Sequence, residues 1–435
     1  MCACFGGRCV SASEQVEAAC RLVPALADHA VIPGSALIVP QLDAAWALLE
    51  NAVTLDPTFA PAHAARGNLL LRRGKTDAAR RSYSLAARFD LYDAPSRIAL
   101  GELAYMAGDE PEAQRWFTEA LALTRLYAPA PRAGTRSALV LCVGGPWHRN
   151  IPLDFVVDPA RWALHRWYLP DAAAERGDVE LPAYELVIDA IGESVEAQPA
   201  LDAAQRFIAS QSKPAINDPQ RVHGLARDAL AATLQHVRGC AAAPSRRVGR
   251  DELPQIASGF PLLVRPADTH GGRGLERLDD TAALAAYATR FPAASYDVGA
   301  FVDYCSADGY YRKYRVMFVD GEPYPYHLAI DRAWMIHYRS APMDEHAWMR
   351  DEERRFLQTP EKALAGWHTA LRAIGAAAGL DYFGIDCTVL ADGNVFVFEA
   401  DTAMLVHRFT TDPAKAAAVD CIRTALAGLL DRRAG

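Results

Sequence analysis

The pattern of apolar, small and polar positions changes near residue 130. Before that point, small and apolar residues recur 34 positions apart. The matched pairs are Gly67 and Gly101, Gly74 and Gly108, Ala79 and Ala113, Tyr83 and Phe117, and Ala86 and Ala120. Such a period is typical of a repeated helix–turn–helix unit, in which small residues let two helices approach and larger apolar residues fill the gaps between units. We therefore predict an α-helical repeat region in this part of the chain.

This region resembles the tetratricopeptide repeat over residues 26–128, with two clear units and a degenerate first unit. Pro57 is expected to end the preceding helix because proline cannot continue it. The chain departs from the family at His63 and Arg97, which stand at the usual tryptophan position, and at Leu91, where a closing proline is usual. A plain helical hairpin bundle is the alternative. The resemblance implies a groove for a peptide or protein partner.

After residue 136, short apolar runs alternate with helical stretches. Strands are expected over residues 137–145, 184–192 and 213–218, with a helix over 200–210. This alternation favours an α/β layer with parallel strands over residues 137–240. Residues 129–136, rich in proline, alanine and arginine, are expected to form a linker, and residues 1–25 are left unassigned.

From residue 241 to 435 the pattern is that of an α+β domain. Strand-like runs follow one another closely, at residues 260–266, 298–304, 311–330, 383–390 and 394–401. The dipeptides Asp308-Gly309, Asp320-Gly321 and Asp392-Gly393 separate several of them and indicate tight antiparallel hairpins. Helical stretches are expected at residues 279–290 and 360–379.

Composition narrows the class of protein. The chain has 435 residues, 51% hydrophobic and 23% charged, which is ordinary for globular proteins. The net charge of −8 argues against a broad nucleic-acid surface, and no apolar run reaches the ~18 residues that span a bilayer. Nine scattered cysteines and no secretory signal favour a reducing cytoplasm. The spacing of Cys2, Cys4, Cys9 and Cys20 matches no standard zinc pattern.

A glycine-rich segment follows an apolar strand at residues 265–274, RPADTHGGRG. Gly271, Gly272 and Gly274 free the backbone, so that peptide N–H groups can turn toward a phosphate chain. Arg265 and Arg273 can add positive charge with bidentate geometry. The alternative is a glycine-rich hairpin turn without a ligand.

Three carboxylates lie on the last predicted hairpin. Asp386 is on its first strand, and Glu399 and Asp401, two residues apart, share one face of its second strand. Three anions at close range are costly unless a hard divalent cation joins them, and oxygen ligands favour Mg²⁺, with Mn²⁺ as the second choice. Solvated acids on a surface hairpin are the alternative.

A third cluster, of cations, lies on the strand that begins at residue 311. Arg312, Lys313 and Arg315 crowd this strand, with Lys313 and Arg315 on one face. An edge strand protected by charge is the alternative. Taken with the glycine-rich segment and the carboxylates, these cations complete the parts that phosphoryl transfer requires.

These three segments, LLVRPADTHGGRG, KYRVMFVDGE and FGID…VFEAD, resemble the ATP-grasp superfamily, which includes glutathione synthetase-like and D-alanine–D-alanine ligase-like enzymes. The resemblance covers roughly residues 137–430. It implies an α/β pre-ATP-grasp domain over residues 137–240, followed over residues 241–435 by an ATP-grasp domain made of a lid and a magnesium-binding lobe.

The resemblance also implies roles. Arg265 would hold the α- and β-phosphates, and a flexible loop would cover them. The loop residues are Thr269, His270, Gly271, Gly272, Arg273 and Gly274. Ala300, Phe301 and Val302 would form the hinge around adenine, with Asp303 near the ribose. Arg315 and Lys313 would be catalytic, and Asp386, Glu399 and Asp401 would bind magnesium. The chain departs from the family at Asp401, where asparagine is usual, and lacks an acidic or amide residue before Phe301.

The implied activity is an ATP- and Mg²⁺-dependent carboxylate–amine ligase that forms a C–N bond through an acyl phosphate. The repeats would recruit a peptide, protein or carrier substrate, and Arg332, His337 and Arg339 would meet a substrate carboxylate. Two alternatives stay open: a kinase-like phosphotransferase acting on a small molecule, and a non-enzymatic scaffold that senses nucleotide and binds a protein partner.

Overall fold

The computed structural model describes residues 3–5, 8–23, 41–129, 133–170, 179–267, 269, 272–338, 340–359, 362, 364–407, 410 and 412–435. The chain forms two compact units. Unit 1 comprises Met1–Arg149 and Pro159–Glu185, and unit 2 comprises Asn150–Asp158 and Leu186–Gly435. The chain therefore passes from one unit to the other more than once, and each unit is described by itself below.

Helices that pack in pairs make up most of unit 1. The pairs are α1 (Ala12–Leu22) with α2 (Gln41–Leu55), α3 (Ala60–Arg72) with α4 (Thr76–Phe89), and α5 (Ala94–Met106) with α6 (Glu110–Leu123). The side chains of Asp93 and Asp109 cap α5 and α6 by accepting from the backbone N–H groups of Ser96 and Glu112. The helical region is as predicted, and α2 ends at Leu55, just before Pro57. Helix α1 lies in the segment left unassigned above.

The glycines of the period-34 pattern sit where two helices touch. A methyl group at Gly67 in α3 would lie 2.4 Å from Cε1 of Tyr83 in α4. At Gly101 in α5 it would lie 2.7 Å from Cε1 of Phe117 in α6. Both rings are buried, and Tyr83 also belongs to a core cluster with Leu100 of α5. The sequence period thus reflects glycine–aromatic contacts within a pair and core packing between pairs.

Unit 1 also contains β-strands. In one group β4 (Arg136–Val143) pairs in parallel with β5 (Trp162–Leu169), and β3 (Leu126–Tyr127) pairs antiparallel with β5. A separate hairpin joins β1 (Ala3–Phe5) and β2 (Arg8–Val10), and a 3₁₀ turn covers Trp147–Arg149. Strand β4 was predicted, because its buried residues form one apolar run. Strand β5 was not, because His165 and Arg166 interrupt its apolar pattern.

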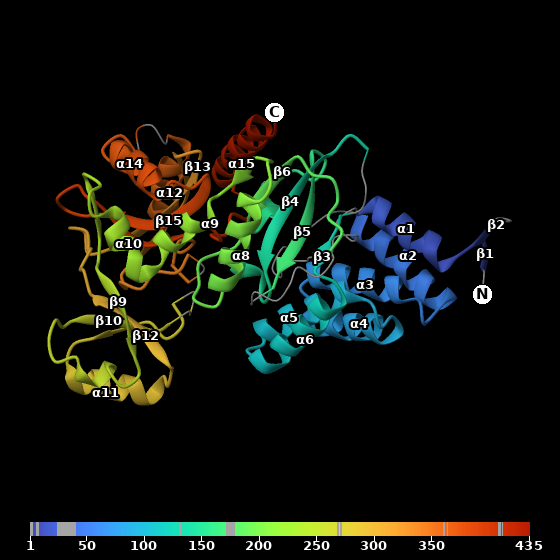
Figure 1. Ribbon diagram of the computed structural model, residues 1–435, viewed down its shortest axis with the longest axis horizontal. Helices are drawn as coiled ribbons and strands as arrows, with labels where there is room; N and C mark the ends of the chain where they lie inside the picture. The colour runs from blue at the N-terminus through green and yellow to red at the C-terminus, as the bar shows by residue number, and fades with distance from the viewer. Residues whose placement is uncertain are drawn as a thin grey trace. The chain divides into compact units, whose positions relative to one another are not determined.

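A four-stranded antiparallel sheet, which we call the lid, lies in unit 2. Its strand order is β11 (Glu276–Leu278), β10 (Leu262–Pro266), β12 (Ser295–Ala300) and β9 (Ser245–Gly249). Helix α11 (Thr281–Arg290) lies beside this sheet (Figure 1). Its Leu284 and Tyr287 share a core with Val264 and Tyr296 of the sheet. The helix expected over 279–290 is therefore present.

The second sheet of unit 2 has five strands, and we call it the main sheet. Its order is β14 (Glu322–Asp331), β13 (Tyr311–Val319), β15 (Tyr382–Val389), β16 (Val395–Asp401) and β8 (Cys240–Ala242). All neighbours are antiparallel except β16 and β8. Helices α12 (Ala347–Gln358), α14 (His368–Ala378) and α15 (Pro413–Ala434) pack against it, and α10 (Arg227–Leu234) contacts both β9 of the lid and β16. Helix α10 therefore spans the two sheets.

The other elements of unit 2 include a short parallel pair, β6 (Leu186–Asp189) and β7 (Ala215–Ile216), which agrees with the parallel strands predicted. The small helical elements are α7 (Leu153–Val156), α8 (Gln198–Ala209), α9 (Pro219–Val222), η3 (His223–Leu225) and η4 (Leu253–Gln255). Asn217 ties the end of β7 to β15, because its side chain donates to the carbonyl of Tyr382 and accepts from the N–H of the same residue. None of the helices in the described ranges is both long and apolar enough to cross a membrane.

Candidate active site

A buried carboxylate held by two cations lies at the centre of the main sheet. Arg315 on β13 pairs in register with Asp386 on β15. The guanidinium donates from Nε to Oδ1 of Asp386 at 2.7 Å and from Nη2 to Oδ2 at 3.0 Å, and Lys313 Nζ lies 3.0 Å from Oδ2. Burial alone would raise the pKa of Asp386, but Arg315 and Lys313 outweigh burial and hold this pKa well below its usual value. Asp386 is therefore ionised at neutral pH.

Two β-bulges decide which residues face this carboxylate. Between β15 and β16 the register slips at Asp386, so that Phe398 is the extra residue and Glu399 lies opposite Asp386. Between β13 and β14 it slips at Arg315, so that Tyr326 is the extra residue and His327 lies opposite Arg315. A bulge inserts one unpaired residue and re-aims its neighbours. The strands on either side of the β13–β15 pair, β14 and β16, therefore each contain a bulge at the level of Arg315 and Asp386.

Glu399 is held by a cation that the sequence analysis did not single out. Arg227, the first residue of α10, places Nη2 2.5 Å from Oε1 of Glu399, and its Nη1 is 3.7 Å from Oδ2 of Asp297 on β12. Burial opposes the charge on Arg227, yet Glu399 and Asp297 raise its pKa above the usual value. Arg227 lies in an ordinary amphipathic helix with no motif around it, so only the three-dimensional fold reveals it.

The glycine-rich segment leaves the lid strand β10 beside these groups. Arg265 is buried, and its Nε donates to Oγ1 of Thr269 at 3.0 Å, while its Nη2 donates to the carbonyl of Thr269. Burial and then the guanidinium of Arg227 lower the pKa of Arg265 to about 10. Gly272 and Gly274 have φ values of 74° and 68°, which favour glycine. His270 and Gly271 lie outside the described residues.

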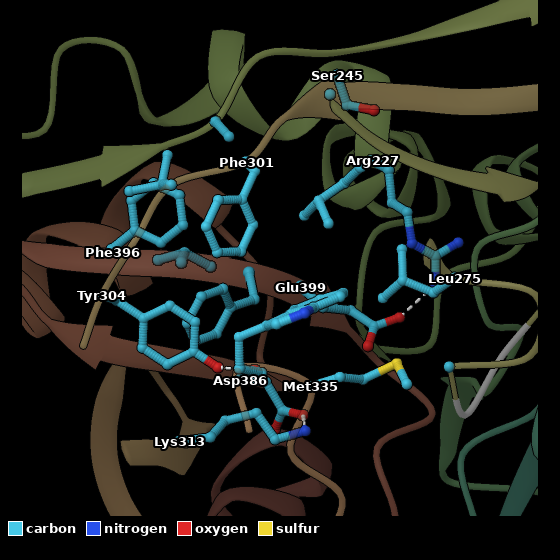
Figure 2. A pocket seen from close by; sticks show the side chains of 18 of the residues that line it. Arg227, Ser245, Leu275, Phe301, Tyr304, Lys313, Met335, Asp386, Phe396 and Glu399 are labelled. Carbon is cyan, nitrogen blue, oxygen red and sulfur yellow. Dashed lines mark hydrogen bonds and ion pairs between the residues drawn. The ribbon is translucent and has the colours of Figure 1, made fainter. Parts of the chain in front are cut away.

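A cleft between the lid and the main sheet joins these features, and it encloses about 300 Å³. Figure 2 shows its two ends: Phe301 and Phe396 gather at one, while Arg227, Lys313, Asp386 and Glu399 lie at the other. Ala300 and Val302 also line the apolar part. One cleft therefore offers an apolar slot continuous with a strongly charged end.

Three predicted site residues, Asp303, Arg273 and Asp401, are not among the residues that line the cleft. Asp303 accepts from the hydroxyl of Tyr311 and the N–H of Cys305 at the surface, and it is not among the residues that line the cleft. Arg273 is likewise described but does not line it. Asp401 lies opposite Gly384, and its carboxylate accepts from the N–H of Ala403. Burial raises the pKa of Asp401 to about 7.

Of the predicted substrate residues that the structure describes, His337 lines the cleft and Arg332 does not. His337 lines the cleft and contacts the loop, because a methyl group at Gly272 would lie 2.4 Å from Nε2 of His337. Burial and then Lys313 lower the pKa of His337. Arg332 is exposed and lies over the ring of Tyr310, with Cζ 4.8 Å from the centroid. Arg339 lies outside the described residues.

The arrangement of the acidic side chains bears on the prediction that Asp386, Glu399 and Asp401 bind a metal ion. Within the residues that the structure describes, no group of three or more histidine, cysteine, aspartate or glutamate side chains is placed to hold a metal ion. Asp386 and Glu399 face each other across β15 and β16, but cations occupy both carboxylates. Cys2 lies outside the described residues, and the structure describes no side chain for Cys4 or Cys9.

Comparison with known proteins gives structural similarity only. No protein-family model and no curated protein sequence matches the chain. A RimK-domain ATP-grasp protein from Sphaerobacter thermophilus has a TM-score of 0.42 and 14% identity, covering 67% of this chain and 98% of that one. The VanG D-Ala:D-Ser ligase from Enterococcus faecalis has a TM-score of 0.42 and 12% identity, covering 68% of this chain and 99% of that one. Because similarity at this level assigns neither fold nor activity, the proposal below rests on the geometry of the cleft.

Proposed function

We propose that this chain is an ATP- and Mg²⁺-dependent ligase of the ATP-grasp type, which joins a carboxylate to an amine through an acyl phosphate. The observation that carries the proposal is the cleft between lid and main sheet, apolar at one end and cationic at the other. A nucleoside triphosphate has the same division, with a flat base and a tetra-anionic tail. We place the adenine against Ala300, Phe301 and Val302.

The charged end suits the phosphates. Arg265 and Arg227 are guanidiniums that can bind phosphate oxygens in pairs, and both line the cleft. In this structure Thr269 accepts a hydrogen bond from Arg265, and the loop that would cover the phosphates begins at Thr269. Fixed cations that do not reorganise during the reaction are the usual means of stabilising charge in phosphoryl transfer.

The donor set also suits magnesium. Asp386 and Glu399 supply oxygen ligands from adjacent strands, and Asp401 lies at the end of the same hairpin. In this structure their partners are Lys313, Arg315 and Arg227, which are the cations that the phosphates would attract. When bound, the metal would neutralise phosphate charge. Lys313 and Arg315 would then face the transferred group, bind its oxygens and hold the reacting carboxylate in line.

A nucleotide-binding experiment tests this proposal. ATP with Mg²⁺ should raise the melting temperature of the wild-type protein, since a ligand at one hundred times its Kd stabilises by about 2.7 kcal/mol. Glu399→Ala and Arg265→Ala should each abolish most of this rise. Arg290→Ala is the matched control, because Arg290 is an exposed lid arginine paired with Glu276. A wild-type protein whose melting temperature ignores ATP and Mg²⁺ would contradict the proposal.

Product analysis separates the ligase from the kinase-like alternative. A ligase should release ADP and phosphate only when a carboxylate and an amine are both present. A stable phosphorylated product formed from one substrate alone would favour the kinase. A panel of carboxylates and amines, read out by ADP release, makes this distinction and narrows the substrates.

We also propose that the paired helices α1–α6 act as a tetratricopeptide-type module that recruits the peptide, protein or carrier substrate. Support comes from the period of 34 and from the equivalent contacts of Gly67 with Tyr83 and Gly101 with Phe117. Surface residues of α3 and α5 would be replaced, and the binding of candidate carrier peptides to each variant would be compared with their binding to the wild type. This comparison tests the role of the helices separately from ATP binding.

A further inference from the structure

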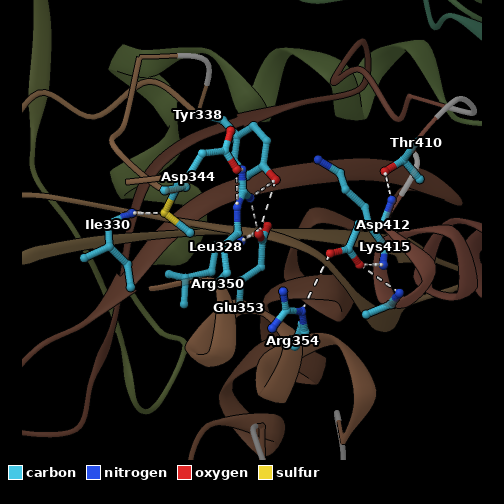
Figure 3. Close-up of polar contacts among 12 residues, drawn as sticks. Leu328, Ile330, Tyr338, Asp344, Arg350, Glu353, Arg354, Thr410, Asp412 and Lys415 are labelled. Atoms are coloured by element: carbon cyan, nitrogen blue, oxygen red, sulfur yellow. Dashed lines mark hydrogen bonds and ion pairs between the residues drawn. The ribbon is translucent and has the colours of Figure 1, made fainter. Parts of the chain in front are cut away.

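A second buried cluster of polar side chains lies on the main sheet, next to Arg315 but outside the cleft lining. Its buried members are His327 on β14, Glu353 on α12 and Lys415 in the first turn of α15. The half-buried Tyr338, in the segment after β14, contacts all three. Figure 3 shows Tyr338, Glu353 and Lys415 drawn together, with Arg350 beside them. The proposed roles of the cleft residues do not use this cluster.

The ammonium of Lys415 has ring faces for neighbours instead of oxygen atoms. Its Nζ lies 3.8 Å from the ring centroid of Tyr338 and 5.2 Å from that of Tyr326. Only 9% of the residue is exposed. In the described part of the chain this ammonium forms no hydrogen bond and no ion pair. Aromatic faces attract a cation, but they do not replace the hydrogen bonds it loses on leaving water.

His327 is a second buried group that lacks a partner. It is 4% exposed, and its Nδ1 has no hydrogen-bond partner among the described residues. Its ring centroid lies 4.5 Å from that of Tyr338, so His327 and Lys415 contact the same aromatic ring. Buried polar atoms without partners are rare, and each calls for a ligand, a water or another explanation.

The anions of the neighbourhood are already engaged. Glu353 Oε2 accepts from Arg350 at 2.7 Å and from the hydroxyl of Tyr338 at 3.3 Å, while Oε1 faces the N–H of Leu328 at 3.4 Å. Asp386 is occupied by Lys313 and Arg315. Three half-buried cations, Lys313, Arg315 and Arg350, thus already engage the two buried carboxylates, and the buried ammonium of Lys415 is left without an anion. A buried charge without a counter-ion is costly unless an anion from outside completes the site.

The cluster adjoins the proposed reaction centre. His327 lies opposite Arg315 in the strand register, and Arg315 is close enough to Lys415 to lower the pKa of the latter. Burial is the largest cause, Arg350 and then Arg315 add to it, and Glu353 opposes them, which brings the pKa of Lys415 to about 8. An anion held by Lys415 would thus lie near Arg315.

We propose that Lys415 and His327 form the binding site for the carboxylate of the acyl substrate, beside Arg315. This inference deepens the proposed function and rests on it, because it takes Arg315 as the residue that faces the transferred phosphoryl group. It assigns the recognition of the substrate anion to Lys415, whereas the exposed Arg332 is stacked on Tyr310. The ligand class is a carboxylic acid small enough to reach a mostly enclosed site.

Lysine labelling tests the assignment directly, since the chain contains only five lysines: Lys75, Lys213, Lys313, Lys362 and Lys415. Glyoxylate, a small carboxylate that carries an aldehyde, forms an imine with an unprotonated amine and releases water, and borohydride then reduces the imine to a stable amine. Peptide mapping reports the modified residue. We expect Lys415 to be labelled, and acetate, succinate or glutamate at constant ionic strength to protect it.

The pattern of protected lysines tests the proposed nucleotide site and the proposed carboxylate site separately. ATP with Mg²⁺ should protect Lys313, and carboxylates should protect Lys415. Protection of Lys415 by inorganic phosphate but not by any carboxylate would overturn the assignment, and so would a Lys415 that is never labelled or is labelled regardless of carboxylates. Loss of ATP protection at Lys313 alone would contradict the nucleotide site and leave the Lys415 result to be judged by itself.

Variants give an independent measurement. Lys415→Met should raise the KM for the carboxylate at least tenfold while leaving the ATP-dependent rise in melting temperature unchanged, and Lys415→Arg should recover part of the loss. Lys213→Met, at an exposed lysine, is the control and should change neither value. If Lys415→Met instead changes KM for ATP and carboxylate alike, the residue has a structural role and the inference fails.

Discussion

Asp386 is the residue on which the charged end of the cleft depends. Its carboxylate is buried and receives both Arg315 and Lys313. The Coulomb attraction within such a group offsets the cost of removing the charges from water only while every member is present. The same three side chains that suit catalysis therefore also contribute to the stability of the main sheet.

We predict that Asp386→Ala destabilises the protein by about 3–5 kcal/mol, because it leaves two buried cations without their anion. Urea unfolding followed by circular dichroism measures this difference. Glu322→Ala is the matched control: Glu322 lies on strand β14 of the same sheet, and its ion pair with Arg372 is exposed. It should cost less than about 1 kcal/mol. If both substitutions lowered the free energy of unfolding equally, the ion pairs of Asp386 would contribute no more to stability than an exposed ion pair.

Glu102 in α5 is also a buried carboxyl group, but burial is the main influence on its pKa. Its Oε1 accepts from the N–H of Trp147 at 2.7 Å, while Oε2 has no partner among the described residues. Burial raises the pKa of Glu102 to about 8, and the hydrogen bond from Trp147 only partly opposes this. The folded protein therefore keeps a proton that the unfolded chain releases near its ordinary pKa of 4.5.

It follows that stability falls as pH rises through the window from about 4.5 to 8. The expected contribution of Glu102 is about 1.4 kcal/mol per pH unit within the window and none outside it. Glu102→Gln should reduce this slope by the contribution of Glu102 and stabilise the protein at pH 8. Urea titrations at a series of pH values would show it, and a variant with the wild-type slope would contradict the assigned protonation.

The residue types of the site could be read from the sequence, but their partners could not. Glycines after a strand, cations on a strand and acids on a hairpin are local patterns. The sequence therefore offers Arg265, Lys313, Arg315, Asp386 and Glu399 as candidates, and in the structure all five line one cleft. Arg227, His327 and Lys415 come from elements far apart in the chain and have no local pattern. Only the folded arrangement shows that they lie beside the same groups.

At the level of elements, the two bulges matter most. From the Asp392-Gly393 turn, Val389 pairs with Val395 and Cys387 with Val397, so an unbroken ladder would put Phe398 opposite Asp386. The bulge at Phe398 brings Glu399 there instead. Alternation along the sequence can predict a hairpin, but it cannot predict a one-residue slip in register. Strand existence was therefore predictable, while the pairing of the two acids depended on a feature that only the structure shows.

The paired helices allow a sharp test of the period of 34. Gly67→Ala should destabilise the protein by about 1–3 kcal/mol, because the added methyl group meets the buried ring of Tyr83, which has no room to move. Gly428→Ala is the control, since Gly428 also lies within a helix but its nearest neighbour is the flexible end of Arg432. That change should be neutral or stabilising by up to about 1 kcal/mol. Thermal unfolding of both variants measures the contrast.

On the scale of the whole molecule, the chain divides its tasks between two compact units. The proposed nucleotide and carboxylate sites lie in unit 2, and the helical pairs lie in unit 1. Residues without shared partners usually contribute additively to stability and binding.

We therefore predict that Gly67→Ala leaves the ATP affinity within about twofold of the wild-type value, although it lowers stability. Isothermal titration with ATP and Mg²⁺ below the unfolding temperature would measure the affinity. A tenfold loss would show that the helical pairs influence the nucleotide site, and the two units would then have to be treated as coupled.

The interleaving of the units also bears on how the chain is made. Unit 1 includes Pro159–Glu185, which contains β5, and unit 2 includes the earlier segment Asn150–Asp158. During synthesis, which proceeds from the N-terminus, the helices of unit 1 can form early, but β4 waits for β5 to leave the ribosome before it gains its parallel neighbour. Asn150–Asp158 waits longer still, because α15, which contacts α7, begins only at Pro413. A nascent chain stalled before residue 162 would thus expose the apolar β4 strand, which makes this interval the point in synthesis where a chaperone would be most needed.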